Sequence, residues 1–478
     1  MDFKVTLSVS ACLTEMLGDE LLQQRYVRYL NDRISLAEQE MRVFACNARL
    51  ASLARREHDR FVHCLTVFIE KWGMDLRRAF GYLQSSGNVA VIPSAATHAY
   101  GPLWETWPQV VDLQVRVAVE HYQKTFGTAP SGYWLPECGF FPGIDILLAQ
   151  ADVQYFFLDS HGICNACPKP KYGVYAPIHC PRGVAAFGRD WGSHEQVWLK
   201  DRGYPGEPAY LNYNRDIGFE RDIEYLYPFT HHSGRIPTGI RYFRIGSESQ
   251  TMLYDSELAA VRCDEHATHF VSQCKVRVRS LLHALGKKPV LVALFDTEHF
   301  GHWWREGPRW LDQMIRKMSY DQEDVKLVTA VDYLHSNPMN QIASPSMSSW
   351  GYQGYSETWL MGRNHWIYPA IFETIELLEK LIDKRLLTDK QRRMAVEQYL
   401  REMMLAQSSD WSFMIHAQNA GRYPEDRVRE HLDNMLTLYD QLSQGRIQEE
   451  WVESLKIKHN IFSGLDLVDI YLRCSKAI

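Results

Sequence analysis

The sequence predicts an α/β fold, and three observations support that prediction. Short apolar runs alternate with segments of helical periodicity across residues 89–331, which is typical of parallel strands joined by helices. The segment Pro289–Pro308 begins with a continuous apolar run, as a strand buried on both faces does. That run ends in Asp296, Glu298 and His299, at the strand edge where α/β folds keep their active sites. An ordinary strand-to-loop junction with solvated charges is the alternative.

Composition is that of a globular protein with a sizeable core. The chain has 478 residues, 46% of them hydrophobic and 23% charged, and its length favours two or three domains. The net charge of −6 disfavours a nucleic-acid partner, which would require a basic face. No apolar stretch reaches the ~18 residues of a membrane span, and the N-terminus lacks the pattern of a secretory signal. We therefore expect a cytoplasmic protein without a membrane partner.

The ten cysteines fit that compartment. Most are single residues in apolar or helical stretches, among them Cys46, Cys64 and Cys274, where buried thiols are expected. One cluster, Cys164-x-x-Cys167 followed by His179-Cys180, has a spacing that zinc sites use. A structural zinc site usually has a second such pair, so the sequence favours no metal.

Seven apolar runs predict the strands of this fold. They are Lys4–Ser10, Val89–Pro93, Gly132–Leu135, Gln154–Leu158, Gly239–Phe243, Val290–Leu294 and Leu327–Val331. Helices are expected between them, from about Trp107 to Phe126 and from about Pro142 to Ala151. The long segment from Gly162 to Gly239 has little periodicity, and a loop of that length is typical of a lid or a cleft wall.

Two further regions are expected to be helical. The stretch from Asp19 to Trp72 contains neither proline nor glycine, and its apolar spacing predicts a helical insertion at about residues 13–85. After Pro345 the pattern is again helical. The expected helices are Ile371–Asp383, Asp389–Met404, Asp426–Gln444 and Gln448–Lys456. We therefore divide the chain into a catalytic α/β domain, residues 1–345, and a C-terminal α-helical domain, residues 346–478.

Three carboxylates directly follow predicted strands, namely Glu137, Asp159 and Asp296, and His98 occupies the matching position after its own strand. If these strands are neighbours, their C-terminal ends converge on one cleft. Two carboxyl groups there, one ionised and one protonated, are the equipment for cleaving a glycosidic bond. Asp159 is assigned a structural role, in which it holds a loop or a neighbouring histidine. His98 fits either a cleft residue or a hydrogen-bonded core histidine.

Aromatic residues are abundant, with 14 Trp and 25 Tyr. Flat rings beside acids and glycines suit a sugar-binding cleft, because the C–H faces of pyranose rings pack on them. Large aromatics also dominate the packing of protein cores. Composition leaves that choice open, and the same two alternatives apply to Trp359 and Trp366.

Five motifs make the chemistry more specific. They are WLPECGFFPG at 134–143, FDTEHFGHWWREGP at 295–308, AATH at 95–98, SSWG at 348–351 and AQSSDW at 406–411. Together they resemble the sequence regions of glycoside hydrolase family 57, most closely its 1,4-α-glucan branching members, over essentially the whole chain. The resemblance implies an incomplete (β/α)7 barrel with a helical C-terminal domain over the cleft. It also implies retaining transfer of an α-1,4-glucan, such as amylose or a glycogen-like polysaccharide, to an α-1,6 position without a cofactor.

The resemblance also implies roles for residues at matching positions. Glu137 matches the nucleophile that forms the glycosyl-enzyme, and Asp296 matches the general acid/base. The expected substrate-binding residues are His98, Arg202, Gly218, Trp303, Trp350, Trp359 and Asp410. Tyr172 and Tyr175 fall in the loop whose tyrosine, in branching members, favours glucan over water as acceptor. The sequence does not distinguish between these two tyrosines.

One departure from the family pattern lies at the N-terminus. Family members begin with a strand that carries a His-x-His pair, whereas this chain starts within the match to the second strand. We therefore expect a mis-assigned start codon or a truncated gene product, whose unpaired strand edges weaken folding or activity. Two alternatives to branching stay open. One is an α-amylase or 4-α-glucanotransferase of the same family, and the other is a non-catalytic glucan-binding protein.

Overall fold

The computed structural model describes four ranges of the chain: residues 3–231, 234–246, 252–382 and 388–474. The chain folds into two compact units. Unit 1 comprises Met1–Val5, Met16–Ala90 and Asp190–Thr329, and unit 2 comprises Thr6–Glu15, Val91–Arg189 and Ala330–Ile478. Each unit is therefore assembled from three separate segments of sequence. The domain boundary expected between residues 345 and 346 stays a prediction.

The main sheet of unit 2 has the strand order β3-β4-β6-β5. Its strands are β3 (Gly132–Tyr133), β4 (Tyr155–Leu158), β5 (Ile178–His179) and β6 (Ala185–Gly188). Parallel pairing joins β3 to β4 and β4 to β6, whereas β5 runs antiparallel to β6. All four residues of β4 are buried, as is typical of a parallel strand covered on both faces.

A second sheet joins β1 (Val5–Ser8) to β2 (Val89–Ile92). These two strands, with β3 and β4, confirm four of the seven strands expected from the sequence. The expectation for Gly239–Phe243 is wrong, because this segment forms only isolated β-bridges through Arg241 and Phe243. Within the described residues, six strands form two sheets, and a barrel of seven strands is not established.

The last two strand expectations are also wrong. Val290–Leu294 forms no strand, although the backbone N–H of Asp190 donates to the carbonyl of Val292 at 2.8 Å. Leu327–Val331 is likewise not a strand, and helix α13 (Ala330–Ser336) begins within it. A buried extended segment and a strand share an apolar composition. Only backbone pairing over several residues distinguishes them, so apolar runs alone predict too many strands.

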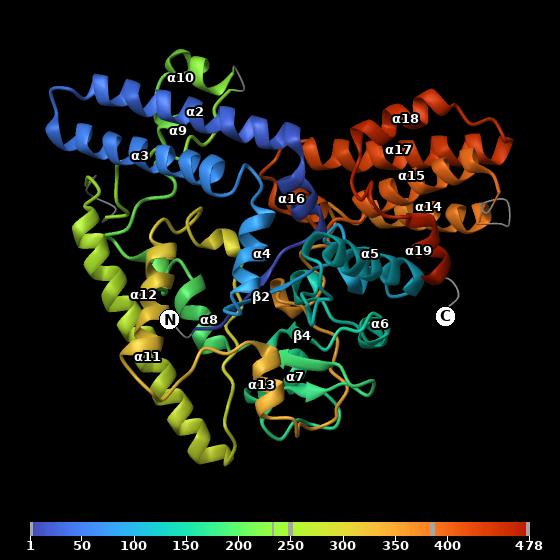
Figure 1. Ribbon diagram of the computed structural model, residues 1–478, viewed down its shortest axis with the longest axis horizontal. Helices are drawn as coiled ribbons and strands as arrows, with labels where there is room; N and C mark the ends of the chain where they lie inside the picture. The colour runs from blue at the N-terminus through green and yellow to red at the C-terminus, as the bar shows by residue number, and fades with distance from the viewer. Residues whose placement is uncertain (1–2, 232–233, 247–251, 383–387, 475–478) are drawn as a thin grey trace. The chain divides into compact units, whose positions relative to one another are not determined.

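Two long helices, α2 (Glu20–Val43) and α3 (Ala48–Thr66), lie side by side in unit 1 (Figure 1). Each begins at a residue whose side chain accepts a hydrogen bond from a backbone N–H of the first turn, Asp19 for α2 and Asn47 for α3. The shorter helices of the same stretch of sequence are α1 (Ala11–Gly18), η1 (Val67–Lys71) and α4 (Arg77–Ser85). These elements confirm that the inserted region is helical.

The segment from Gly162 to Gly239 is more regular than its sequence suggested. Besides β5 and β6 it contains α8 (Trp191–Trp198), α9 (Ile217–Glu220) and α10 (Ile223–Thr230). Elements of four to eight residues are too short to give a visible period, so the expectation of one long irregular loop is wrong. Its role as a lid or cleft wall stays a prediction.

Unit 1 also holds two helices that pack on each other, α11 (Ser256–Leu285) and α12 (Gly307–Tyr320) (Figure 1). Their core includes Trp304 and Trp310, whose ring centroids lie 5.5 Å apart. Both indole rings are fully buried. Trp304 and Trp310 therefore belong to the core of unit 1.

Unit 2 contains the C-terminal helices. They are α14 (Ile367–Leu381), α15 (Lys390–Ala406), α16 (Ser409–Ala417), α17 (Tyr423–Gln444), α18 (Glu449–Lys458) and α19 (Leu467–Cys474). Helices α14, α15, α17 and α18 confirm the four expected there, although Asp383, the expected end of the first, lies outside the described residues. Helix α15 packs against α17 (Figure 1). Most of α15 is buried, so it forms the centre of this helical group.

The remaining elements are short, apart from one helix. They are α5 (Pro108–Phe126), α6 (Ile144–Gln150), α7 (Ser160–Cys164), η2 (Gly101–Trp104), η3 (Pro136–Cys138), η4 (Gly173–Tyr175), η5 (Tyr204–Gly206), η6 (Thr297–His299) and η7 (Tyr352–Gly354). Helices α5 and α6 confirm the two expected between the early strands.

The cysteines, all within the described residues, form no disulfide. Cys274 is buried as expected, whereas Cys46 is exposed, so that expectation is wrong for Cys46. In the zinc-like cluster, Cys164 and Cys167 are exposed and Cys180 is buried. Among the described residues, no helix combines the length and the apolar character needed to cross a membrane.

Candidate active site

Glu137 lies on a strained turn that follows β3. The turn η3 places Glu137 at φ 60° and ψ 22°, and Cys138 at φ 52°. Left-handed backbone costs a residue with a side chain roughly 1–2 kcal/mol, so two in succession persist only where their surroundings hold them. Pro136 contributes by restricting Leu135 to extended backbone.

The segment 348–350 holds this turn in place. The N–H of Phe140 donates to the carbonyl of Ser348 at 2.8 Å, and the N–H of Ser348 donates back at 3.2 Å. The N–H of Trp350 donates to the carbonyl of Glu137 at 3.0 Å. These three bonds pair the turn with a distant part of the chain along its whole length, which offsets the cost of the left-handed residues.

The carboxylate of Glu137 accepts a hydrogen bond at each oxygen. The indole Nε1 of Trp350 donates to Oε2 at 2.8 Å, and the hydroxyl of Ser409 donates to Oε1 at 3.1 Å. Two donors at fixed positions orient the carboxylate, whose side chain is 18% exposed. Glu137 is therefore both held and accessible, as a nucleophile must be.

His98 completes this group of side chains. Its Nδ1 lies 3.1 Å from the hydroxyl oxygen of Ser409 and 3.9 Å from Oε1 of Glu137. Because the hydroxyl proton of Ser409 goes to Glu137, its oxygen accepts from Nδ1 of His98. The backbone of His98 is also left-handed, at φ 56°, and its carbonyl accepts from the N–H of Ser409 at 3.1 Å. His98 therefore reaches Glu137 through Ser409, a residue that the sequence analysis did not single out.

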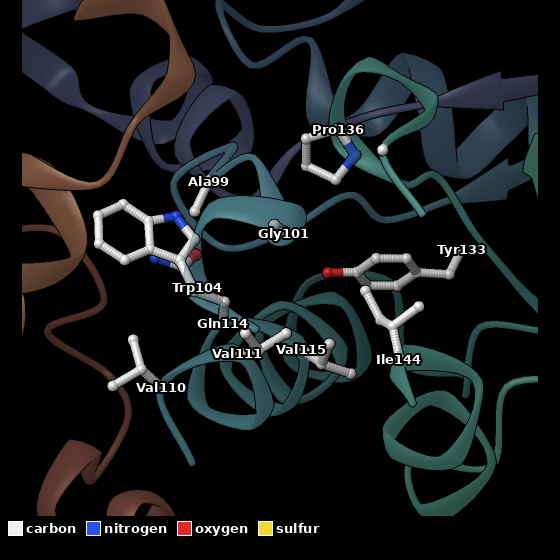
Figure 2. A pocket seen from close by; sticks show the side chains of 12 residues that line it. Ala99, Gly101, Trp104, Val110, Val111, Gln114, Val115, Tyr133, Pro136 and Ile144 are labelled. Carbon is white, nitrogen blue, oxygen red and sulfur yellow. The ribbon is translucent and has the colours of Figure 1, made fainter. Parts of the chain in front are cut away.

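A small cavity lies beside Pro136 (Figure 2). Mainly apolar side chains of residues 95–115 and 133–144 line it. Its volume is about 10 Å³, the lower limit for a single water molecule. The cavity is therefore a packing gap next to the Glu137 turn and has no room for a sugar.

Two residues expected to bind substrate in unit 2 differ in exposure. Trp359 is 2% exposed and stacks on Tyr100 with ring centroids 4.3 Å apart. A Cβ on Gly351 would lie 2.5 Å from this indole, so Trp359 supports the loop that carries Trp350. Its burial argues against direct contact with a sugar and favours the core alternative. Asp410 is exposed in the first turn of α16 and accepts a hydrogen bond from Ser408 at 3.2 Å.

Asp159 has the structural role expected of it. It is 2% exposed, pairs with Arg189, and accepts from the backbone N–H and hydroxyl of Ser160. Nδ1 of His161 lies 3.3 Å from its Oδ1. Burial would raise the pKa of Asp159, but the hydrogen bond with His161 and the charge of Arg189 outweigh burial and lower it. Asp159 is therefore an ionised anchor for its neighbours.

Asp296 belongs to unit 1, where it is half-buried and precedes the turn η6. The segment before it is held through its carbonyls. One of these, that of Leu294, accepts from Nδ1 of His194 at 2.9 Å. The N–H of His299 donates to the carbonyl of Asp296 at 3.3 Å, which closes the turn. The carboxyl group thus follows an extended segment at the start of a helical turn.

Trp303 presents an exposed ring in the same motif. Its indole is 39% exposed and meets the indole of Trp198 edge-on at 6.3 Å. His299 contacts both rings and donates from Nε2 to the carbonyl of Val197 at 2.8 Å. Burial lowers the pKa of His299, so its ring is neutral near neutral pH. Trp198 was missed by the sequence analysis because it lies outside the motifs.

Arg202 and Gly218 lie in separate environments in unit 1. Arg202 is exposed in the turn between α8 and η5. Gly218 is buried in α9, where an added Cβ would lie 2.0 Å from the carbonyl oxygen of Ile236. Close backbone packing is therefore sufficient reason for glycine at 218. Substrate contact by either residue stays a prediction.

The two loop tyrosines are distinguished by their packing. Tyr175 packs against the hydrophobic core of unit 2. Tyr172 precedes η4, and the ammonium group of Lys171 lies over its ring at 5.3 Å. Both tyrosines are half-buried, and the choice between them for contact with an acceptor stays a prediction.

A buried group in the C-terminal helices, Glu402 with His431 and His459, could in principle hold a metal ion. Nδ1 of each histidine lies 2.7 or 2.8 Å from an oxygen of Glu402, and both Nε2 atoms lie 3.2–3.3 Å from the guanidinium of Arg427. A guanidinium only donates, so the Nε2 atoms accept and the Nδ1 atoms donate to Glu402. The group therefore fits a hydrogen-bond network better than a metal site, because Arg427 already places a cation against it.

Family models match almost the whole chain. One, described as glycosyl hydrolase family 57, matches residues 2–345, and another, the C-terminal part of 1,4-alpha-glucan branching enzyme, matches residues 370–469. A 1,4-alpha-glucan branching enzyme of Thermococcus kodakarensis is 27% identical over 96% of this chain and 70% of its own length. A probable 1,4-alpha-glucan branching enzyme of Mycobacterium tuberculosis is 27% identical over 90% of this chain and 77% of its own.

Solved structures of related proteins resemble this one over nearly its full length. The alpha-amylase AmyC from Thermotoga maritima has a TM-score of 0.91 at 37% identity, and the match covers 98% of this chain and 90% of that one. The branching enzyme from Pyrococcus horikoshii has a TM-score of 0.86 at 26% identity, covering 98% of this chain and 87% of that one.

The first family model spans both carboxylates singled out above, Glu137 and Asp296. It also spans the strained turn and the segment before η6 that carry them. With a match over more than two thirds of the residues and a shared fold, the chain belongs to glycosyl hydrolase family 57.

Proposed function

We propose that this chain is a 1,4-α-glucan branching enzyme that works by retaining transglycosylation. The observation that carries the proposal is the support of Glu137, whose carboxylate oxygens each accept a fixed donor on a left-handed turn. A nucleophile needs such a fixed orientation to attack a single atom of a bound glucan. The branching enzymes among its relatives support the choice of reaction.

In the proposed reaction, Glu137 attacks the anomeric carbon of an α-1,4-linked glucose and forms a glycosyl-enzyme. Asp296 gives its proton to the departing glycosidic oxygen, so the leaving chain departs as an alcohol. Asp296, now ionised, takes the proton from the 6-hydroxyl of an acceptor glucan, and that oxygen displaces Glu137. Two displacements retain the α configuration, and the transferred segment ends in an α-1,6 bond.

The proposal has structural requirements. The carboxyl groups of Glu137 and Asp296 must lie ~5–5.5 Å apart, and a separation beyond ~6.5 Å in a crystal structure would contradict retention. The proposal also retains two expectations from the sequence. These are the incomplete (β/α)7 barrel of the family and the synthesis of a glycogen-like polysaccharide in the cytoplasm. The proposed substrate contacts are His98, Arg202, Gly218, Trp303, Trp350 and Asp410.

An α-amylase is the second candidate, and a specific observation favours it. AmyC, at 37% identity, is described as an alpha-amylase. An amylase uses the same nucleophile and acid/base but passes the glycosyl group to water. The two candidates therefore differ in the acceptor, and the product reports which acceptor is used.

Incubation of the chain with linear amylose tests the proposal. We expect proton NMR to show α-1,6 linkages that outnumber the new reducing ends. An excess of reducing ends without branches would support the amylase instead. Glucan binding with neither product would support the binding-protein alternative.

The variants Glu137→Gln and Asp296→Asn test the assigned residues. Each should lower the rate of α-1,6 bond formation by at least ~10²–10⁴-fold, the contribution of acid–base catalysis alone. Glu298→Gln is the matched control, because Glu298 is an exposed carboxylate two residues beyond Asp296. It should keep the parent rate, and an equal loss there would show that the effect of Asp296→Asn is not specific.

A further inference from the structure

The ring of His161, on α7, contacts the loop that carries Trp350. Its Nε2 lies 2.8 Å from the carbonyl oxygen of Gly354, and its Nδ1 lies 3.3 Å from Oδ1 of Asp159. A carbonyl oxygen can only accept, so Nε2 carries a hydrogen. Asp159 also accepts from Ser160 and pairs with Arg189, as an ionised carboxylate does, so Nδ1 carries a hydrogen too. The geometry therefore assigns His161 a doubly protonated, cationic ring.

The groups that face this ring support that assignment. Asp159 and Arg189 are the charged neighbours, and the ring of Tyr355 meets the imidazole edge-on at 5.5 Å. The hydrogen bond with Asp159 raises the pKa of His161, while burial and Arg189 oppose that rise. If the ring lost one proton, Nδ1 would keep its hydrogen, because the charged carboxylate of Asp159 is a stronger acceptor than a neutral carbonyl. The carbonyl of Gly354 would then lose its donor.

Helix α7 and the loop approach closely at two glycines. A Cβ on Gly162 would lie 2.3 Å from the hydroxyl oxygen of Ser348, and a Cβ on Gly354 would lie 2.9 Å from the ring of His161. Gly354 has φ +85°, a left-handed conformation that favours glycine. The N–H of Ser346 donates to the carbonyl of Gly162 at 3.0 Å. The loop is therefore fitted against α7, with His161 as its ionisable contact.

A short series of bonds links this contact to Glu137. The carbonyl of Gly354 that accepts from His161 also accepts from the N–H of Ser349 at 2.8 Å. The next residue is Trp350, whose backbone N–H and indole Nε1 both donate to Glu137. The N–H of Gly354 donates to the carbonyl of Gly351 at 2.9 Å, which closes the loop on the far side of Trp350. A shift at Gly354 therefore moves the donors of the carboxylate.

We infer that His161, oriented by Asp159, is a positioning residue that fixes the loop 348–355 and thereby holds the Trp350 donor on Glu137. The inference rests on the proposed role of Glu137 as nucleophile. Because His161 does not touch the reacting atoms, its loss disturbs the orientation of the nucleophile and leaves glucan binding in place. It should therefore lower kcat and leave KM nearly unchanged.

The variants His161→Ala and His161→Gln test this inference. His161→Ala removes both contacts and should lower kcat roughly tenfold, as expected for loss of a hydrogen bond from a charged group. His161→Gln retains an amide donor near the position of Nε2, so it should recover most of kcat. In the parent, kcat should decline as pH rises above 6.5, the usual pKa of histidine, and His161 loses its proton. Glutamine cannot titrate, so that part of the decline should be absent in His161→Gln.

Gly354→Ala approaches the same contact from the loop and does not depend on how the His161 variants fold. It should lower kcat like His161→Ala, since its Cβ would strike the imidazole. His365→Gln is the matched control, because His365 is exposed and its ring also faces a carbonyl oxygen, that of Gly362 at 3.0 Å. It should match the parent protein in every assay.

Amide hydrogen exchange separates this inference from the proposed function. Exchange over residues 346–355 should speed up in His161→Ala, and in the parent protein as His161 loses its proton, whether or not the chain forms branches. If exchange, kcat and its pH dependence stay at parent values in both His161 variants, the inference is overturned. If exchange over residues 346–355 speeds up in His161→Ala while Glu137→Gln keeps full activity, His161 does fix the loop and the proposed role of Glu137 fails.

Discussion

Glu137 and Asp296 each follow an apolar run in the sequence, yet the structure supports them in different ways. Glu137 lies on a left-handed turn whose backbone is paired with the segment 348–350, and both its carboxylate oxygens accept a donor. Asp296 follows a segment without strand structure and opens a single helical turn. The same sequence pattern therefore leads to a left-handed turn in one unit and to extended backbone before a helical turn in the other.

The support of Glu137 matches what its proposed role requires. A nucleophile must keep one orientation relative to a carbon atom, so fixed donors on its oxygens favour the reaction. A general acid/base must instead release and regain a proton in each cycle. The donors on Glu137 therefore agree with its proposed role, and the variants below test both roles.

The largest expected effect tests the two proposed roles separately. It uses a substrate whose leaving group needs no proton, so only the nucleophile is required for the first step. With α-maltosyl fluoride, Asp296→Asn should still form the glycosyl-enzyme and release a burst of fluoride, although its turnover of amylose falls by ~10²–10⁴-fold. Glu137→Gln should release no burst, because it lacks the nucleophile. A fluoride electrode measures both, and a burst from Glu137→Gln with none from Asp296→Asn would exchange the two roles.

The second effect concerns the buried network of Glu402 on α15, the helix that precedes Ser409, a donor to Glu137. Glu402→Gln should lower the free energy of unfolding by about 3–5 kcal/mol, since it breaks a buried charged network. Burial lowers the pKa of His431 from its usual 6.5. Burial would raise the pKa of Glu402, but its hydrogen bonds with His431 and His459 lower it from 4.5 to about 2.

Both pKa shifts give the same sign of pH dependence. A folded-state pKa below the unfolded value means that the unfolded chain binds more protons, so acid favours unfolding. Stability from His431 should decline as pH falls below 6.5, and stability from Glu402 as pH falls from 4.5 towards 2. Thermal unfolding across pH measures this, with the exposed Glu376→Gln on α14 as control. A melting temperature for Glu402→Gln equal to that of the parent near pH 7 would contradict the prediction.

The smallest expected effect tests a single hydrogen bond, the one that the indole of Trp350 donates to Glu137. Trp350→Phe keeps a ring but removes the indole donor to Glu137, and should lower kcat roughly 10–100-fold with a smaller change in KM. Trp366→Phe serves as control, because Trp366 packs under the guanidinium of Arg429, away from this carboxylate's bonds. Steady-state kinetics on amylose distinguishes the two, and equal losses would assign Trp350 to general packing.

The sequence was informative wherever a local pattern determines the structure. The motif around Glu137 correctly placed an acid just after β3, and the apolar period correctly predicted α2, α3, α15 and α17. It also led to the structural role of Asp159. Each of these features depends on residues close together in the chain.

Features that depend on distant pairing could not be predicted. Val290–Leu294 has the composition of a buried strand but not its partners, and Trp359 could not be separated from a surface tryptophan before its contact with Tyr100 was seen. Ser409 and His161 act through residues far from them in the chain. No local pattern specifies the left-handed backbone of Glu137 either, because that conformation is imposed by the segment 348–350.

That pairing has a consequence for how the protein matures during synthesis. Chain elongation delivers Glu137 long before Trp350 and Ser409, the residues that fix its carboxylate. Unit 1 has its last residue at Thr329, so it can fold on the ribosome while Glu137, the proposed nucleophile, still lacks both partners. The carboxylate of Glu137 therefore gains its donors late, and a message truncated before Ser409 yields protein in which this proposed nucleophile lacks its Ser409 donor.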